Sequence, residues 1–342
     1  MREFGSDFHK CDFDYRNNNT FYEMMLDARY YASGRLAIDA IVAQEGWKRI
    51  WMPAYFCYEI INHIAAGIEV KLYDDNPLIE DERPAIDAIP FEIGDVLLRM
   101  NFFGLRDKRS NEDIPVQVIE NHTHGLTCQW SLKSDADYCM ASLRKSLPLA
   151  AGGVLWSPKR LHLPEPIPTT QECKSMGAKR YKAMRLKADY IKEKSDDKDA
   201  FRKLYLETED EIDALKLSGI DRESKEIVDN FDIRLWSQNR VENWEVACKR
   251  LSPKFHILKT PDPYLCYPFS LVILCDTPEE RTRLKQYLVN NKIYPAVLWN
   301  MPNDSPFTKA KDFSLRMLSI HCDPRYSRNA ITQMCDIINK YD

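Results

Sequence analysis

The chain has 342 residues, 44% of them hydrophobic and 11% aromatic, and its 48 Lys+Arg against 52 Asp+Glu give a net charge of −4. At roughly 100 to 200 residues per domain, this length corresponds to one large domain or two ordinary ones, and the aromatic content excludes a mainly disordered chain. The small net charge disfavours a nucleic acid or a membrane surface as the main partner, and no apolar run reaches the roughly 20 residues that a membrane span needs.

The N-terminus and the cysteines both indicate a cytoplasmic protein. Residues 1–7 lack the basic region and the apolar stretch of a signal peptide. None of the ten cysteines has CxxC spacing, and some, such as Cys275, lie within apolar runs, where a reduced thiol acts as a small hydrophobe. We therefore expect a cytoplasmic chain whose cysteines are reduced.

Short apolar runs alternate with amphipathic stretches in the first half of the chain. Two of the amphipathic stretches, 35–44 and 58–66, are expected to be helices. The apolar runs predict strands at 49–52, 68–73, 95–99, 116–119, 138–142 and 153–156. Because most of these strands are apolar on both faces and are interleaved with helices, they indicate a mostly parallel sheet that is covered on both sides.

The pattern changes after residue 168. Charge is dense between 174 and 225, and apolar residues recur at helical spacing, which predicts long amphipathic helices with solvated outer faces. A second group of elements follows, with strands expected at 270–275, 293–298 and 316–320 and helices at 278–290 and 327–341. These elements predict a smaller βαβ-like domain.

The segment around Lys145 is the most informative for chemistry. Lys145 follows a buried strand and precedes the glycine pair Gly152-Gly153, which leads into the next strand. A lysine in a partly desolvated site loses its proton readily and can form a Schiff base with an aldehyde. The alternative is an ordinary surface lysine in a loop.

Three other segments extend this interpretation. Residues 33–35 come immediately before a helix, where backbone N–H groups bind phosphate and Arg35 can add a positive charge. The polar residues 120–124 end one strand at the sheet edge where α/β proteins bind ligands, and the aromatic residues of 53–58 lie at another such edge. Together with Lys145, these features describe a pocket for pyridoxal phosphate.

The chain resembles the DegT/DnrJ family of pyridoxal-phosphate-dependent sugar aminotransferases, which have the aspartate-aminotransferase-like fold, fold type I. The matching segments are 33–35, 52–55, 69–73, 101–104, 118–120 with 123–124, 142–145, 240–244, 293–295 with 298–299, 318–320 and 325–326. The resemblance implies an α/β fold with a large domain on a mostly parallel, seven-stranded-type sheet and a smaller α/β C-terminal domain.

The resemblance also implies domain boundaries. We expect an N-terminal arm at 1–20, a large cofactor-binding domain at 21–235 and a small C-terminal domain at 236–342. The charged helical segment near 168–225 belongs to the large domain in this division.

Residue by residue, the resemblance assigns cofactor contacts on two sides of the pocket. Lys145 matches the lysine that holds the cofactor through a Schiff base and later shuttles the proton. Ser33, Gly34 and Arg35 match the turn that binds the cofactor phosphate. Ser142 lies near the position of a serine that also reaches this phosphate.

The cofactor ring is matched by aromatic and polar residues. Tyr55 or Phe56 is expected to stack on the pyridine ring, and His124 stands where the family has Gln or His close to the ring hydroxyl. Asn121 replaces an aspartate that pairs with the protonated pyridine nitrogen in the family. A neutral amide cannot hold that positive charge, and the adjacent Glu120 is expected to point to the opposite face of the strand.

Other candidate sites are weaker. His122 and His124 are close in sequence, but no third metal ligand lies near them, so no metal site is expected. Residues 321–323 read His-Cys-Asp, but adjacent residues on a strand cannot converge as a catalytic triad. The resemblance implies that Arg325 clamps a substrate carboxylate, and the alternative is a surface salt bridge.

The resemblance implies a homodimeric aminotransferase with its pocket at the subunit interface. Glutamate or glutamine would donate the amino group, and a nucleotide-linked keto-sugar used in surface polysaccharide synthesis would accept it. Asn121 leaves a second hypothesis open, a family member that binds the cofactor with impaired or lost transaminase activity, and also a register shift of one residue. A third hypothesis is a nucleotide-sugar-binding module without cofactor.

Overall fold

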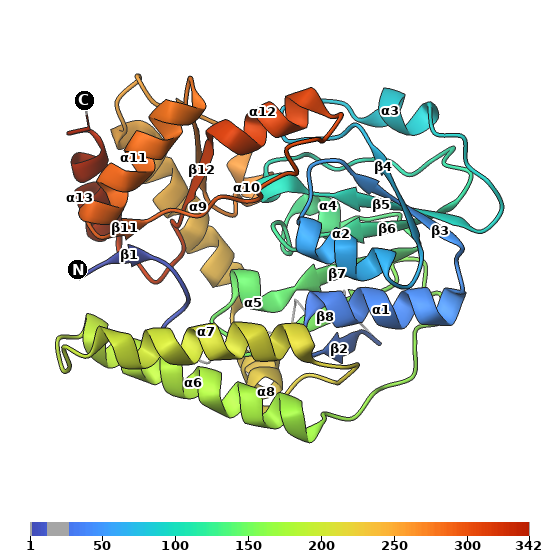
Figure 1. Cartoon of the computed structure of the whole chain (residues 1–342), viewed down its shortest axis with the longest axis horizontal. Helices are drawn as coiled ribbons and strands as arrows, with labels where there is room; N and C mark the ends of the chain where they lie inside the picture. The colour runs from blue at the N-terminus through green and yellow to red at the C-terminus, as the bar shows by residue number, and fades with distance from the viewer. Residues whose placement is uncertain (1, 12–26, 342) are drawn as a thin grey trace. The chain divides into compact units, whose positions relative to one another are not determined.

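A computed structural model describes residues 2–11 and 27–341 of the chain (Figure 1). The main sheet has seven strands, in the order β2 (Arg29–Tyr31), β8 (Gly153–Trp156), β7 (Tyr138–Ser142), β6 (Gln117–Asn121), β5 (Asp95–Met100), β3 (Arg49–Pro53) and β4 (Glu69–Tyr73). This mixed α/β architecture and its seven-stranded sheet confirm the fold class expected from the sequence.

The chain forms two compact units. The first unit comprises residues 1–6, 46–136 and 236–342, and the second comprises residues 7–45 and 137–235. The division after residue 235 coincides with the boundary expected from the sequence, whereas the grouping of 46–136 with the C-terminal residues differs from it. Part of the expected N-terminal arm, residues 12–20, lies outside the described residues.

The first unit contains the parallel part of the main sheet. Strand β3 pairs in parallel with β4 and β5, and β5 pairs in parallel with β6. All six residues of β5 are buried, and its two charged residues are paired, Asp95 with Arg49 and Arg99 with Asn111. Helix α2 (Tyr58–Ala65) lies against β4, and the short elements α3 (Arg83–Asp87), η2 (Phe102–Gly104) and α4 (Gln129–Leu132) connect the strands.

The C-terminal part of the first unit has its own small sheets. Strand β10 (Leu271–Leu274) pairs antiparallel with β12 (Met317–Ile320) and β9 (His256–Ile257), while β11 (Ile293–Tyr294) pairs in parallel with β1 (Phe4–Gly5). The expectation of a βαβ-like arrangement is therefore wrong for the strand pairing. The strand expected at 293–298 is only two residues long, and its partner is the N-terminal strand.

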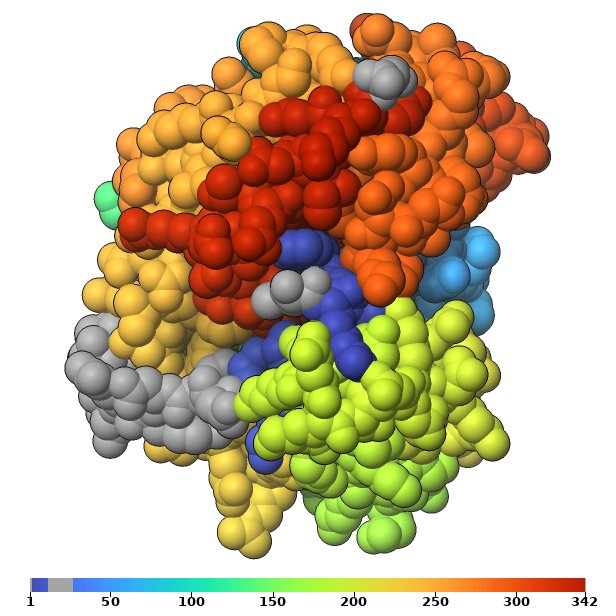
Figure 2. Space-filling view, turned by 90° about the vertical axis from the view of Figure 1, so that its left-hand side faces the viewer, coloured from blue at the N-terminus to red at the C-terminus, as the bar shows by residue number. Residues whose placement is uncertain are grey.

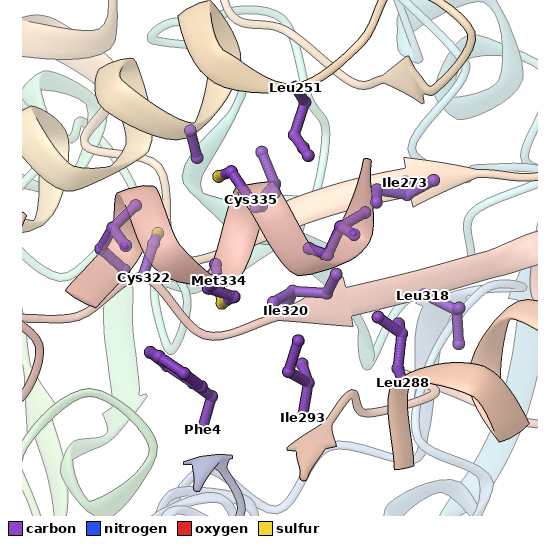
Figure 3. Close-up of a cluster of buried hydrophobic side chains, with 14 of the residues drawn as sticks. Phe4, Leu251, Ile273, Leu288, Ile293, Leu318, Ile320, Cys322, Met334 and Cys335 are labelled. Atoms are coloured by element: carbon purple, nitrogen blue, oxygen red, sulfur yellow. The ribbon is translucent and has the colours of Figure 1, made fainter. Parts of the chain in front are cut away.

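A hydrophobic core holds these C-terminal elements together. Figure 3 shows Phe4 and Ile293 from the two short strands on one side of helix α13 (Arg328–Ile338), which contributes Met334 and Cys335. The other elements of this region are α9 (Ile233–Arg250), α10 (Pro263–Cys266), α11 (Pro278–Asn290) and α12 (Thr308–Arg316). In Figure 2 the red C-terminal segment lies between the gold and orange segments of the same unit.

The second unit combines antiparallel strands with long helices. Strand β8 pairs antiparallel with β2 and β7, and helix α1 (Gly34–Glu45) packs on these strands. Helices α6 (Gln171–Ile191) and α7 (Lys198–Ala214) lie side by side, and α8 (Arg222–Asn230) follows them. The side chains of Thr170, Asp197 and Asp221 cap the N-termini of α6, α7 and α8. These helices confirm the amphipathic pattern expected after residue 168.

The cysteines and the hydropathy agree with the sequence interpretation. All ten cysteines are free, and seven of them are buried. Burial raises the pKa of the Cys128 thiol to about 12, so this thiol stays protonated at neutral pH. Among the described residues, no helix combines the length and the apolar character needed to cross a membrane.

Candidate functional site

The turn at Ser33 and Gly34 packs directly on the ends of two strands in the second unit. A Cβ atom on Gly34 would lie 3.0 Å from Cβ of Ser142, at the end of β7. A Cβ atom on Gly153, the first residue of β8, would lie 2.1 Å from the carbonyl oxygen of Ser33. Only glycine fits at the separation found for residue 153, and a side chain at residue 34 would have to displace Ser142 by a few tenths of an ångström. The structure therefore brings Ser33, Gly34 and Ser142 together, and their contact with a cofactor stays a prediction.

This turn leaves backbone donors at the start of helix α1. The N–H of Leu36 donates to Oγ of Ser33 at 3.3 Å, and the N–H of Ala37 donates to the Ser33 carbonyl at 3.2 Å. Within the described residues, no hydrogen bond is recorded for the backbone N–H groups of Gly34 and Arg35. Such groups at the N-terminus of a long helix, combined with its dipole, favour an anion such as a phosphate.

The side chain of Arg35 has a different role from the one that the sequence suggests. Its Nη1 donates to Oδ1 of Asp213 at 2.9 Å, and its Nη2 donates to the carbonyl oxygens of Ile212 and Asp213 at 2.6 and 2.7 Å. These acceptors belong to the last turn of α7, where helical carbonyls lack partners within the helix. The guanidinium thus binds the end of α7 and not a phosphate. The predicted phosphate contact is therefore assigned to the backbone N–H groups of residues 34 and 35 alone.

Lys145 lies in a single helical turn, α5 (Leu143–Ser146), directly after Ser142. It is exposed, whereas the neighbouring Arg144 forms a bidentate pair with Glu209 at 2.8 and 3.0 Å. Burial alone raises the pKa of Glu209, but the charges of Arg144 and Arg180 outweigh burial and hold that pKa at about 2. The lysine therefore stands beside an ionised carboxylate at the end of β7, and its bond to a cofactor stays a prediction.

In the first unit, aromatic side chains surround the end of β3. The ring of Tyr55 lies 5.0 Å from that of Phe313 and 5.7 Å from that of Trp299, and it is completely buried. Burial raises the pKa of Tyr55 well above its usual value, so its hydroxyl stays neutral and donates to the Leu298 carbonyl. Phe56 is also buried, with its ring 5.8 Å from Trp299.

His124 is held between aromatic rings of the same unit. It stacks on Phe269 at 4.4 Å and on Trp299 at 5.4 Å, with interplanar angles of 21° and 12°. Its Nδ1 accepts a hydrogen bond from the backbone N–H of Phe103 at 3.2 Å. An acceptor at Nδ1 places the proton of the neutral imidazole on Nε2. The ring plane and the tautomer of His124 are therefore both fixed by its surroundings.

Asn121 and Glu120 at the end of β6 point to different partners. Oδ1 of Asn121 accepts the backbone N–H of Thr123 at 3.0 Å. The carboxylate of Glu120 accepts from Nδ2 of Asn111 at 2.7 Å, and it lies 3.0 Å from Nε2 of His122. Burial alone raises the pKa of Glu120, but the hydrogen bond from His122 and the others lower it overall. Glu120 is thus committed to its own buried network, as the alternation of side chains along a strand predicts.

Arg325 forms a buried salt bridge. Its Nε and Nη2 donate to the two carboxylate oxygens of Asp323 at 2.8 and 2.9 Å, and the arginine side chain has no exposed surface. Burial alone raises the pKa of Asp323, but Arg325 and His321 hold it well below its usual range. The sequence left a substrate clamp and a surface salt bridge open; the structure shows a salt bridge, but a buried one, and the guanidinium is engaged by Asp323.

Sequence reasoning did not single out the rings that hold His124. Trp299 lay within a matching segment, but Phe103 and Phe269 carried no assignment. The only signal in the segment 101–104 was Gly104, and in the structure Phe103 and Gly104 both adopt positive φ, 54° and 63°. A Cβ atom on Gly104 would lie 2.5 Å from the His124 carbonyl oxygen, so this glycine permits the close approach of the two segments.

Comparison with known proteins identifies the fold. No family model and no curated protein matches the sequence. A Streptococcus pneumoniae protein described as a sugar aminotransferase, Spr1654, in its PMP form, aligns with 14% identity and a TM-score of 0.66 over 98% of this chain and 93% of that one. A DegT DnrJ EryC1 StrS aminotransferase from Brucella abortus aligns with 13% identity and a TM-score of 0.61 over 95% and 88%.

A third solved structure is similar over slightly less of its length. DesI, solved in the presence of its TDP-sugar product, aligns with 11% identity and a TM-score of 0.58 over 91% of this chain and 79% of that one. At these identities the likeness shows the fold. The chain therefore has the fold of these aminotransferases, which confirms the fold class expected from its sequence.

Proposed function

We propose that this chain is a pyridoxal-phosphate-dependent aminotransferase that acts on a nucleotide-linked keto-sugar. The observation that carries the proposal is the turn at Ser33 and Gly34. This turn begins helix α1 and packs on Ser142, which lies three residues before Lys145. A phosphate cradle of this kind beside a lysine is what the cofactor requires. The fold shared with sugar aminotransferases supports the same conclusion.

The residues of the second unit fit the phosphate and the aldehyde of pyridoxal phosphate. The N–H groups of Gly34 and Arg35, with the hydroxyl of Ser142, would hold the phosphate. Lys145 would supply the amine that binds the cofactor and moves a proton at its Nζ. When bound, the cofactor supplies an aldehyde and an electron-withdrawing ring.

The residues of the first unit fit the ring. Between the two aromatic candidates, we propose Phe56 as the residue that stacks on the pyridine, because Tyr55 is fully enclosed by other rings and its hydroxyl is used. His124 would hold the ring hydroxyl through its Nε2–H. Asn121 would meet the pyridine nitrogen, by the match of its position to the aspartate of the family.

The substrates are proposed from the fold relatives and the family resemblance. DesI was solved with a TDP-sugar product, and we propose a nucleotide-linked keto-sugar as the acceptor for this chain. Glutamate or glutamine is proposed as the amino donor, and surface polysaccharide synthesis as the pathway. A cytoplasmic homodimer with the pocket at the subunit interface stays part of the proposal. Because Arg325 is engaged by Asp323, we leave it out of the proposed substrate site.

Trapping of the cofactor tests the assignment of Lys145. The protein is incubated with pyridoxal phosphate, reduced with borohydride and mapped by peptide mass spectrometry. We expect the phosphopyridoxyl label on Lys145, no label there in Lys145→Ala, and normal labelling in the control Lys159→Ala, since Lys159 is an exposed lysine paired with Asp137. Equal labelling of the protein with and without Lys145 would show that the assignment is wrong.

Asn121 favours one second candidate function, a cofactor-binding relative with impaired or lost transaminase activity. Addition of glutamate, and separately of glutamine, to the loaded protein separates the two candidates. Conversion of the bound aldehyde form to the amine form, seen in the absorption spectrum, supports the aminotransferase. A stable aldehyde form with every donor tested supports the impaired relative, and a chain that binds sugar nucleotides but takes up no cofactor would instead be a binding module.

A further inference from the structure

The amide of Asn121 has a defined orientation. Its Oδ1 accepts the N–H of Thr123 at 3.0 Å, the residue is 6% exposed, and it ends strand β6. An oxygen engaged by a backbone N–H leaves the nitrogen, a donor only, at the other end of the amide. Within the described residues, no hydrogen bond is recorded for Nδ2 of Asn121. The side chain thus offers a hydrogen-bond donor to whatever lies against it.

This orientation explains what the replacement of aspartate changes. Aspartate and asparagine have the same shape, so an aspartate at residue 121 could keep the Thr123 contact through one oxygen and present its second oxygen, an acceptor. Asparagine keeps the same contact and presents an N–H. The substitution therefore preserves the local geometry and reverses the hydrogen-bonding character at one atom.

His124 adds a second donor in the same unit. Its Nδ1 accepts from the backbone N–H of Phe103, and its ring stacks on those of Phe103, Phe269 and Trp299, so the imidazole cannot turn without breaking these contacts. Its Nε2 carries the proton in the neutral form. The family resemblance implies an acceptor at residue 121 and a donor at residue 124. In this chain both residues carry N–H groups, on Nδ2 of Asn121 and Nε2 of His124.

We propose that this chain binds pyridoxal phosphate with the pyridine nitrogen unprotonated, and that Asn121 is the positioning residue that holds this state by donating from Nδ2 to that nitrogen. The inference rests on the proposed function. A protonated pyridine nitrogen would oppose its own N–H to that of Asn121, which leaves both donors without an acceptor, whereas the unprotonated nitrogen accepts the bond. Asn121 then selects a neutral ring that withdraws electrons less strongly than the cationic ring of the family.

Nitrogen NMR of the bound cofactor tests this proposal directly. Pyridoxal phosphate labelled with ¹⁵N at the ring is bound to the full chain, and its shift is compared with those of the protonated and unprotonated cofactor in solution. We expect the unprotonated shift in the natural protein and the pyridinium shift in Asn121→Asp. Asn101→Asp is the matched control, since Asn101 is a buried amide that follows β5 in the same unit, and it is expected to leave the unprotonated shift unchanged.

The outcomes distinguish this inference from the proposed function. A pyridinium shift in the natural protein overturns the role of Asn121 and leaves the cofactor assignment intact. The same shift in Asn101→Asp as in Asn121→Asp would show a general effect of an added carboxylate and would also overturn it. A spectrum with only free cofactor, even at high protein concentration, overturns the proposed function and the inference with it. The decisive spectrum is that of the natural protein, so the test does not depend on a variant that folds.

Discussion

Substitution of Arg325 by methionine should destabilise the C-terminal part of the first unit. The arginine makes two hydrogen bonds to Asp323, at 2.8 and 2.9 Å, and the two side chains are 0% and 4% exposed. Removal of the cation leaves a buried carboxylate without its counter-ion, and such a loss costs about 3–5 kcal/mol. We expect the free energy of unfolding to fall by this amount, measured by urea denaturation with tryptophan fluorescence, because Trp244 lies in the adjoining core.

The matched control is Arg328→Met. Arg328 pairs with Glu242 at the surface, with 66% of its side chain exposed, so its loss should leave the unfolding curve nearly unchanged. If Arg325→Met unfolded like the natural protein but required far more glutamate for half-saturation, Arg325 would be a substrate clamp. That result would refute the buried structural role derived from the contacts with Asp323.

Two further outcomes test the second unit. Gly153→Ala places a Cβ atom 2.1 Å from the Ser33 carbonyl oxygen, so we expect a loss of about 1–3 kcal/mol in stability and weaker cofactor binding. The control Gly67→Ala, whose Cβ atom has its nearest contact at 3.8 Å, should change neither. If Gly153→Ala melted and bound the cofactor like the natural protein, the close approach of residue 153 to Ser33 would be contradicted. Glu209→Gln should remove a stabilisation that is complete above the ordinary glutamate pKa of about 4.3 and is lost as the pH falls through about 2, because the folded pKa is depressed. Parallel urea titrations should show the difference between the two proteins shrinking on acidification, and a difference independent of pH would exclude the ion pairs as its origin.

Elements with a local hydrophobic pattern could be predicted from the sequence. Strands β7 (Tyr138–Ser142) and β8 (Gly153–Trp156) and helix α11 (Pro278–Asn290) begin and end at the expected residues. Each has its apolar residues at a spacing that fits one secondary structure, and Gly153 and Pro278 mark where β8 and α11 begin. The mostly parallel sheet followed from the same information, because strands buried on both faces have no polar alternation.

Features that depend on distant partners could not be predicted in this way. The two residues of β11 pair with the N-terminal strand β1, and no local pattern identifies a partner nearly 290 residues away in the sequence. The guanidinium of Arg35 binds Asp213, 178 residues away. The local sequence around Arg35 is the same whether its side chain binds an anion or another helix. Only the tertiary structure decides between these two partners.

Asn121 shows how the two sources of information combine. Its residue type revealed that a carboxylate was missing from a matched position, and from the sequence this change could only be described as a loss. The hydrogen bond from the Thr123 N–H to Oδ1 shows which end of the amide is used and therefore which end remains. The position that lacks a carboxylate acceptor therefore offers a hydrogen-bond donor, Nδ2 of Asn121, whose orientation is known. The question for this protein thus changes from whether the cofactor ring tolerates the loss of a carboxylate to which protonation state of the ring the amide selects.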